Sequence, residues 1–188
     1  MKRKAENMEN GESSYRRYLD GDESAFAEVQ RAYFDRLTFF SDRYVRDVHA
    51  AEDIAIDTLL ELIVHKHRYN FGSPLSSYLF TIAKNKSLNY LRHRDRFTVT
   101  PIDEEEREAD RASLEEDVLK RDALARVSRA VDALPEEQRA LVHLVYFEGM
   151  TYGSAAKVLG MGKKKADNLL YRARAALKKT LEEETDIL

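Results

Sequence analysis

Cysteine is absent from the 188 residues, so the chain has neither disulfide bridges nor thiolate metal ligands. It also lacks any apolar run near the ~20 residues that a membrane-spanning helix needs. The first residues, MKRKAENMENGESS, are basic but precede no apolar stretch, so we expect no secretory signal peptide and no direct membrane insertion. These absences favour a soluble, cytoplasmic protein.

The usual signatures of catalysis are missing as well. There is no glycine-rich phosphate loop, no HExxH and no Ser-His-Asp set. His65 and His67 lie two residues apart on an expected helix and point in different directions, which makes a metal pair improbable. Asp53, Asp57 and Glu61 suit magnesium in type, but equally spaced acids on one helix do not converge on a point. We expect a protein that is not an enzyme, with no cofactor, metal or small-molecule substrate.

The charge is segregated along the chain, although the net charge is only −3. Residues 101–122 carry ten acidic and four basic residues, a net of −6, which leaves +3 for the rest. Residues 150–179 carry eight basic residues and one acid, Asp167. The acidic block has too little apolar content for a core of its own. We therefore expect two domains, at about 10–97 and 117–188, joined by an acidic linker at 98–116.

Apolar residues recur at helical spacing on both sides of this linker. In the first half they are Phe26, Val29, Tyr33, Leu37, Phe40, Tyr44 and Val48. A second helix is expected to open near Asp47 and to run through AAEDIAIDTLLELIVHKH. Gly72 breaks the pattern, and Ser73-Pro74 opens SPLSSYLFTIAKNKSLNYLRHRDR, with Ser73 as N-cap. Beyond the linker, the pattern resumes at Leu119, and Pro135 opens a further helix. No strand pattern is convincing, so the fold class is all-α.

The segment MTYGSAAKVLGMGKKKADNLLYRARAALKK predicts a helix-turn-helix. A short helix from Tyr152 to Leu159 is followed by a turn over residues 160–162 and a second helix from Lys163. One side of that second helix is apolar, with Ala166, Leu169, Leu170, Ala173 and Leu177. The opposite side is polar and basic. Two other interpretations remain: a solvated charged face, and a membrane-surface helix, which the scarcity of large apolar anchors disfavours.

Two separate stretches resemble extracytoplasmic-function (ECF) sigma factors of the sigma-70 family. The stretch LPEEQRALVHLVYFEGMTYGSAAKVLGMGKKKADNLLYRARAALKK resembles the family's fourth conserved region. AEDIAIDTLLELI and SSYLFTIAKNKSLNYLRHRDR resemble segments of the second conserved region. The resemblance covers about residues 26–181 in the expected order. It implies a second domain of the four-helix type and an initiation factor that binds core RNA polymerase, recognises the −35 and −10 promoter elements and assists DNA opening.

The resemblance assigns polymerase docking to the AED helix, where Asp53, Asp57 and Glu61 share a face. The expected partner is a coiled coil of the largest polymerase subunit, and the second domain is expected to meet the flap region. Ala50 and Ile56 depart from the family pattern at positions where an acid and glutamine are usual.

The resemblance assigns the −10 element to the loop and helix that follow. Tyr78, Asn85, Asn89 and Arg92 fall on one stripe of the helix, which suits stacking on a base and hydrogen bonding to base edges. The loop residues Tyr69, Asn70 and Phe71 match the segment that captures a flipped base. Core packing remains the alternative interpretation for Tyr78 and Phe71.

The basic helix is assigned to the −35 element. The expected contacts are Lys163, Lys164, Lys165, Asn168, Tyr171, Arg172 and Arg174. Lys164 and Asn168, with Tyr171, would read bases, and the others would contact phosphates. Asp167, Leu169 and Ser154 depart from the family pattern, which argues for an unusual upstream element or a weaker dependence on it.

The family also implies partners and leaves one alternative. Members are commonly held inactive by an anti-sigma factor, often membrane-anchored, which masks both lobes. The alternative is a sigma-like helix-turn-helix regulator that binds DNA without engaging core polymerase. The acids at Asp53 and Asp57 argue against it.

Overall fold

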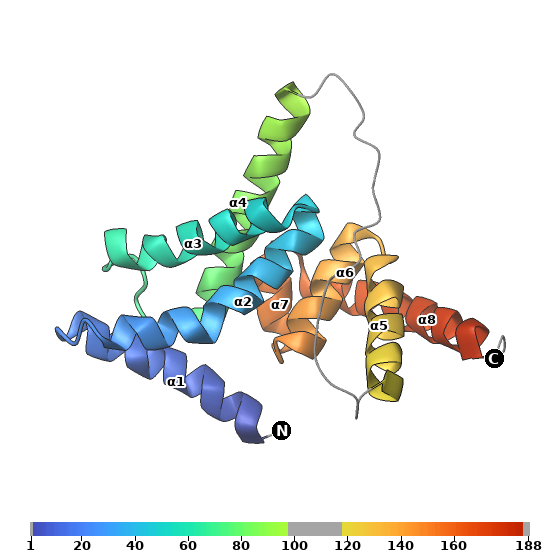
Figure 1. The fold of residues 1–188 in the computed structure, drawn as a ribbon, viewed down its shortest axis with the longest axis horizontal. Coiled ribbons are helices and arrows are strands. Elements are labelled where there is room, and N and C mark those ends of the chain that lie inside the picture. Colours follow the sequence, from blue (N-terminus) through green and yellow to red (C-terminus); the bar gives the residue numbers. More distant parts are fainter. Residues whose placement is uncertain (1, 98–117, 186–188) are drawn as a thin grey trace.

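The computed structural model describes residues 2–97 and 118–185, and every regular element in these ranges is a helix (Figure 1). The prediction of an all-α fold is therefore confirmed. The expected acidic linker at 98–116 lies outside the described residues. None of the helices in the described part of the chain is long and apolar enough to cross a membrane.

The first lobe comprises α1 (Lys2–Leu19), α2 (Ala25–Val45), α3 (Val48–Val64) and α4 (Leu75–Phe97). Helix α2 packs against the other three, and its Phe40 is fully buried with an edge-to-face contact to Phe80 at 5.0 Å between ring centroids. The sequence patterns did not predict α1. Its close approach to α2 requires Gly11, because a Cβ there would lie 2.6 Å from the Tyr33 ring.

The boundaries of α3 and α4 follow local signals. Helix α3 opens beside Asp47 as predicted, and Asp47 is its N-cap: its Oδ1 accepts hydrogen bonds from the backbone N–H groups of His49 and Ala50 at 3.0 and 3.2 Å. The helix ends at Val64, about one turn before the predicted end. Helix α4 begins at Leu75, just after Pro74, rather than with Pro74 in its first turn.

The second lobe comprises α5 (Val118–Asp132), α6 (Glu136–Val142), the π-helical turn η1 (His143–Phe147), α7 (Tyr152–Leu159) and α8 (Lys163–Thr185). Helices α7 and α8 form the predicted helix-turn-helix. Gly160 has a φ of +70° and ends α7 in a Schellman motif, in which Met161 N–H bonds to Ala156 O at 2.9 Å. The side of α8 packed into the lobe carries Ala166, Leu170 and Ala173, all buried.

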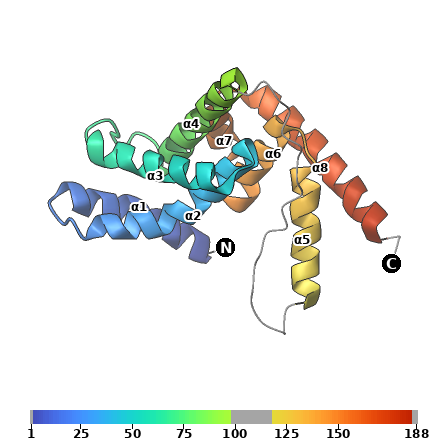
Figure 2. The same ribbon diagram turned by 45° about the horizontal axis from the view of Figure 1, so that its top comes forward.

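The two lobes are in contact, although they come from opposite ends of the chain. Helix α4 packs against α7, and α2 packs against α6. Figure 2 shows α7 beside α4 and the long helix α8 extending away from the first lobe.

Candidate functional site

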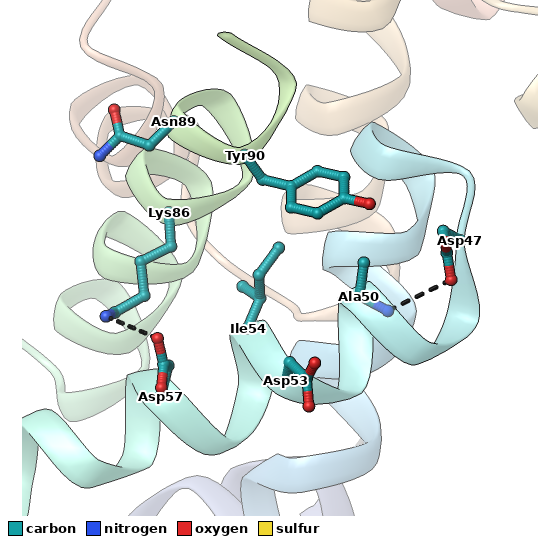
Figure 3. Close-up of a pocket in the computed structure, with 8 residues that line it drawn as sticks. All are labelled: Asp47, Ala50, Asp53, Ile54, Asp57, Lys86, Asn89 and Tyr90. Atoms are coloured by element: carbon teal, nitrogen blue, oxygen red, sulfur yellow. Dashed lines mark hydrogen bonds and ion pairs between the residues drawn. The ribbon is translucent and has the colours of Figure 1, made fainter. Parts of the chain in front are cut away.

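A groove of about 560 Å³ runs between α3 and α4 (Figure 3). Most of its lining residues carry polar groups, and they come from both helices and from the cap of α3. The lining residues are Asp47, Ala50, Asp53, Ile54, Asp57, Lys86, Asn89 and Tyr90. The groove therefore joins the expected docking acids of α3 to the expected DNA-facing stripe of α4.

The three candidate docking acids differ in their surroundings. Asp53 and Asp57 are exposed, and Asp57 Oδ2 lies 3.3 Å from Lys86 Nζ. Glu61 is half-buried and lies near two cations, at 3.4 Å from Arg68 and 3.9 Å from Lys86. Asp53 and Asp57 are thus exposed to a basic partner, but Asp57 already pairs with Lys86, which also lies near Glu61. Glu61 belongs more fully to this ion-pair network within the lobe. Within residues 2–97 and 118–185, no group of three His, Asp or Glu side chains could hold a metal ion.

Beside these acids, α3 carries an apolar stripe that the sequence patterns did not single out. Ile56, Leu60 and Val64 are 46%, 43% and 68% exposed and are spaced four residues apart. The sequence did contain a signal for it: AEDIAIDTLLELIV has more apolar residues than one packed helix face requires, which indicates a second apolar face. A partner helix could therefore bury this stripe while its cations meet Asp53 and Asp57.

The stripe expected to contact DNA runs along α4. Asn85, Asn89 and Arg92 are exposed, and Asn89 lines the groove of Figure 3. Tyr78 is half-buried, with its ring centroid 5.2 Å from that of Tyr69. The structure brings the two amides and the arginine together on one accessible face and leaves Tyr78 at its inner end.

The loop between α3 and α4 presents only part of its expected base-capture set. Asn70 is exposed, and its Oδ1 accepts a hydrogen bond from Gly72 N–H at 3.0 Å. Tyr69 is 4% exposed, and its hydroxyl donates to the carbonyl of Ser73 at 2.7 Å. Phe71 has a φ of +59°, and the Arg16 guanidinium lies 3.8 Å from its ring centroid. In this conformation Tyr69 supports the loop from within, and Asn70 is its outward-facing member.

The candidate residues of α8 divide into free and tethered side chains. Lys163, Lys164, Asn168 and Arg172 are exposed, and Tyr171 is 75% exposed. Two others are held by the second lobe itself. Lys165 Nζ pairs with Glu137 at 2.6 Å, and the Arg174 guanidinium donates to the hydroxyls of Tyr146 and Tyr152. Lys165 and Arg174 would have to leave these partners to reach DNA.

A buried charged cluster between the lobes was not foreseen from the sequence. The Arg36 guanidinium of α2 donates to Glu148, which is 5% exposed, and His143 Nε2 lies 3.4 Å from Glu148 Oε1. Burial lowers the pKa of His143 below its usual value, so the imidazole is neutral at pH 7. Burial alone would raise the pKa of Glu148, but the contacts with His143 and Arg36 leave it lowered.

Both pKa shifts predict that acid weakens this cluster. A histidine with a lowered pKa binds fewer protons folded than unfolded, so its contribution to stability falls as the pH drops below about 6.5. Glu148 acts in the same direction at lower pH, as its carboxylate is protonated. We expect the free energy of unfolding, measured in urea, to fall between pH 7.5 and pH 5.5. His143→Leu should reduce that fall, whereas the control His49→Leu, at an exposed position, should leave it unchanged. If the free energy of unfolding falls equally with pH in both variants, this account is contradicted.

Comparison with known proteins supports the two-lobed description. Residues 30–97 match the family model "Sigma-70 region 2", and residues 124–177 match "Sigma-70, region 4". The RNA polymerase sigma-H factor of Pseudomonas aeruginosa is 29% identical over 171 residues, which cover 86% of this chain and 89% of that protein. The ECF RNA polymerase sigma factor SigM of Mycobacterium tuberculosis is 28% identical, over 87% of this chain and 81% of that protein.

Solved structures show the same fold. The sigma factor RpoE from Bartonella quintana, in complex with the anti-sigma factor NepR, matches with a TM-score of 0.63 and 24% identity, over 84% of this chain and 96% of that chain. CnrH, in complex with the cytosolic domain of CnrY, matches with a TM-score of 0.61 and 21% identity, over 94% and 97% of the two chains.

Two helical lobes with a helix-turn-helix in the second, matched in order by the region 2 and region 4 models, define a transcription factor of the sigma-70 type. The chain belongs to the sigma-70 family. It is similar to proteins named ECF RNA polymerase sigma factors.

Proposed function

We propose that this protein is a sigma initiation factor that binds core bacterial RNA polymerase and directs it to specific promoters. The first lobe docks on the polymerase and opens the −10 element, and the second lobe reads the −35 element. The observation that carries the proposal is the presence of both sigma-70 regions, in order, on one chain. The protein performs no covalent chemistry and acts in the cytoplasm, where binding energy drives DNA opening.

Transcription in vitro tests this function directly. Purified protein is added to core polymerase on a library of promoters, and specific initiation is expected only when both are present. The alternative is a sigma-like DNA-binding regulator that does not engage polymerase. It predicts DNA binding by the protein alone and no co-elution with core polymerase, so one gel-filtration run separates the two.

The anti-sigma partner is also a proposal. RpoE was solved in complex with the anti-sigma factor NepR, and CnrH was solved in complex with the cytosolic domain of CnrY. By analogy, we propose that a protein of this kind controls the present factor. The exposed apolar stripe Ile56–Leu60–Val64 supports such a partner as well as the polymerase, because both would bury it.

The face of α4 should govern promoter melting. We expect Asn85→Ala and Asn70→Ala each to reduce the permanganate reactivity of thymines in the −10 element, because each lost base contact costs about 1–3 kcal/mol. Both side chains are exposed, so stability and polymerase binding should not change. Gln30→Ala, at an exposed position of α2, is the control. Normal strand opening in both asparagine variants would remove these residues from the site.

The lysines at the start of α8 should have separable roles. Lys163→Ala should weaken DNA binding evenly across sequences. It should also lower the slope of log affinity against log salt concentration by about one unit, as expected for the loss of a phosphate contact. Lys164→Ala or Asn168→Ala should instead shift the preferred base at one position by about 1–3 kcal/mol. Lys165→Ala should do less than Lys163→Ala, because Lys165 already pairs with Glu137. Holoenzyme binding to a randomised −35 element at several salt concentrations measures all four; wild-type slopes and preferences throughout would mean that the lysine run is only a solvated face.

A further inference from the structure

Helix α1 lies along α2 (Figures 1 and 2), and its second half contacts the loop of residues 65–74 that joins α3 to α4. Tyr15 of α1 is fully buried, and its hydroxyl donates a hydrogen bond at 2.9 Å to the carbonyl of Leu62, in the last turn of α3. The carboxylate of Glu12 lies 3.2 Å from the hydroxyl of Tyr69. The end of α3 and the loop are therefore attached to α1.

Arg16 of α1 lies over an aromatic ring of this loop. Its guanidinium carbon is 3.8 Å from the centroid of the Phe71 ring. A cation over the face of an aromatic ring at this distance is attracted by the negative charge of that face. Two further rings lie near Phe71, since the centroids of Tyr15 and Tyr69 are 6.2 and 4.7 Å from its own. Arg16 thus completes a small aromatic cluster around Phe71.

The backbone of Phe71 has an unfavourable conformation. Its φ of +59° lies in the left-handed region, which residues with bulky side chains rarely adopt. Such a conformation persists only where surrounding contacts hold it. Phe71 lies within a tight turn, in which Asn70 Oδ1 accepts a hydrogen bond from Gly72 N–H at 3.0 Å. If Phe71 lost its ring contacts and returned to a negative φ, the turn that exposes Asn70 would change with it.

We propose that Arg16 is a positioning residue: by holding the Phe71 ring, it keeps the loop in the shape that captures a base of the −10 element through Asn70. The inference rests on the proposed function. Arg16 acts through Phe71, and its effect is to order the loop before DNA binds, so that binding does not have to do so. If only about one tenth of the molecules keep this loop shape without Arg16, base capture weakens about tenfold.

This role differs from that of a residue that stabilises the whole lobe. The Arg16 side chain is 56% exposed, so its removal leaves no cavity in the core. It also pairs with Glu12 at 3.2 Å, one turn earlier in α1, and exposed pairs of this kind contribute little to stability. We therefore expect Arg16 variants to unfold at the same urea concentration as the wild type.

The test replaces Arg16 in the full chain. Arg16→Ala removes the cation from the Phe71 ring, whereas Arg16→Lys keeps a cation that can reach it. Arg16→Lys should therefore restore most of what Arg16→Ala loses. Arg17→Ala is the matched control, because Arg17 is the next residue, is also exposed and pairs with Glu28 of α2.

The shape of the loop is measured on the free protein by NMR. Magnetisation transfer between the rings of Phe71 and Tyr69 should be strong in the wild type, because their centroids are 4.7 Å apart. It should fall about tenfold in Arg16→Ala and stay near the wild-type value in Arg16→Lys and in the control. Transfer between Phe40 and Phe80, 5.0 Å apart in the core of the same lobe, should not change in any variant. Unchanged transfer between Phe71 and Tyr69 in Arg16→Ala would overturn the proposal.

Base capture is measured by the binding of holoenzyme to single strands of the −10 element, in which one position at a time lacks its base. The captured base is the one whose removal weakens wild-type binding most. Arg16→Ala should weaken binding to the intact strand about tenfold and should not change binding to the strand that lacks this base. Equal weakening on both strands would mean a general structural role and would overturn the proposal.

The two measurements separate the failure of this inference from the failure of the proposed function. If the wild type does not assemble with core polymerase, the proposed function is rejected, and NMR still decides whether Arg16 sets the shape of the loop. If the wild type forms holoenzyme but binds every strand equally with or without the base, the loop captures no base. That result would overturn the role of Arg16 while leaving polymerase binding intact.

Discussion

Reversing Asp53 and Asp57 to lysine is expected to abolish holoenzyme assembly at micromolar concentrations. Both carboxylates are exposed on α3, beside the apolar stripe Ile56–Leu60–Val64, so a docked partner would bring its cations directly against them. Like charges in such an interface cost several kcal/mol, which is a loss of about a thousandfold in affinity. A pull-down with core polymerase measures the effect.

The structure dictates the controls for this experiment. Asp57 also pairs with Lys86, so Asp57→Lys places two cations together within the lobe as well as at the interface. Asp57→Asn removes that ambiguity, and it should weaken assembly less than reversal does. Asp20→Lys/Glu23→Lys makes the same change of charge in the turn between α1 and α2, where both residues are exposed, and should assemble normally. Equal assembly by the two reversed pairs would exclude α3 as the docking helix.

Leu170→Ala should cost about 2–5 kcal/mol of the stability of the second lobe. Leu170 is 1% exposed at the centre of the packed side of α8, and truncation there removes buried contacts and leaves a cavity. The next residue is a matched control, because Tyr171 is 75% exposed. Tyr171→Ala should change stability by less than about 0.5 kcal/mol while altering DNA binding.

The functional result should differ between these neighbours. Leu170→Ala should lose recognition of the −35 element at temperatures where the second lobe unfolds, yet retain polymerase docking through the first lobe. Tyr171→Ala should remain folded and change only affinity or base preference. Urea denaturation gives the stabilities, and holoenzyme binding to promoter DNA gives the rest. A large loss of stability from Tyr171→Ala would show that α8 presents a different face.

The sequence determined the features that local rules control. The bounds of α7 and the start of α8 were predicted, because a stripe of apolar residues at helical spacing and the glycines of the turn define them without help from the rest of the chain. The start of α3 near Asp47 was also predicted from the local pattern. Exposure of Asp53, Asn85, Lys164 and Asn168 also followed from the stripe on which each lies.

Only the tertiary structure decided the rest, since it depends on which distant segments meet. Tyr69 has the aromatic ring that base stacking requires, but the packing of α1, α4 and its own loop buries that ring. Lys165 looks free in sequence, but α6 supplies Glu137 as its partner 28 residues away. Arg36 and Glu148 carry no periodic signal that links them, because a contact 112 residues apart depends on how whole lobes pack. The sequence by itself therefore determined the helices, their amphipathic faces and the family, while the contact between the lobes arises from long-range packing.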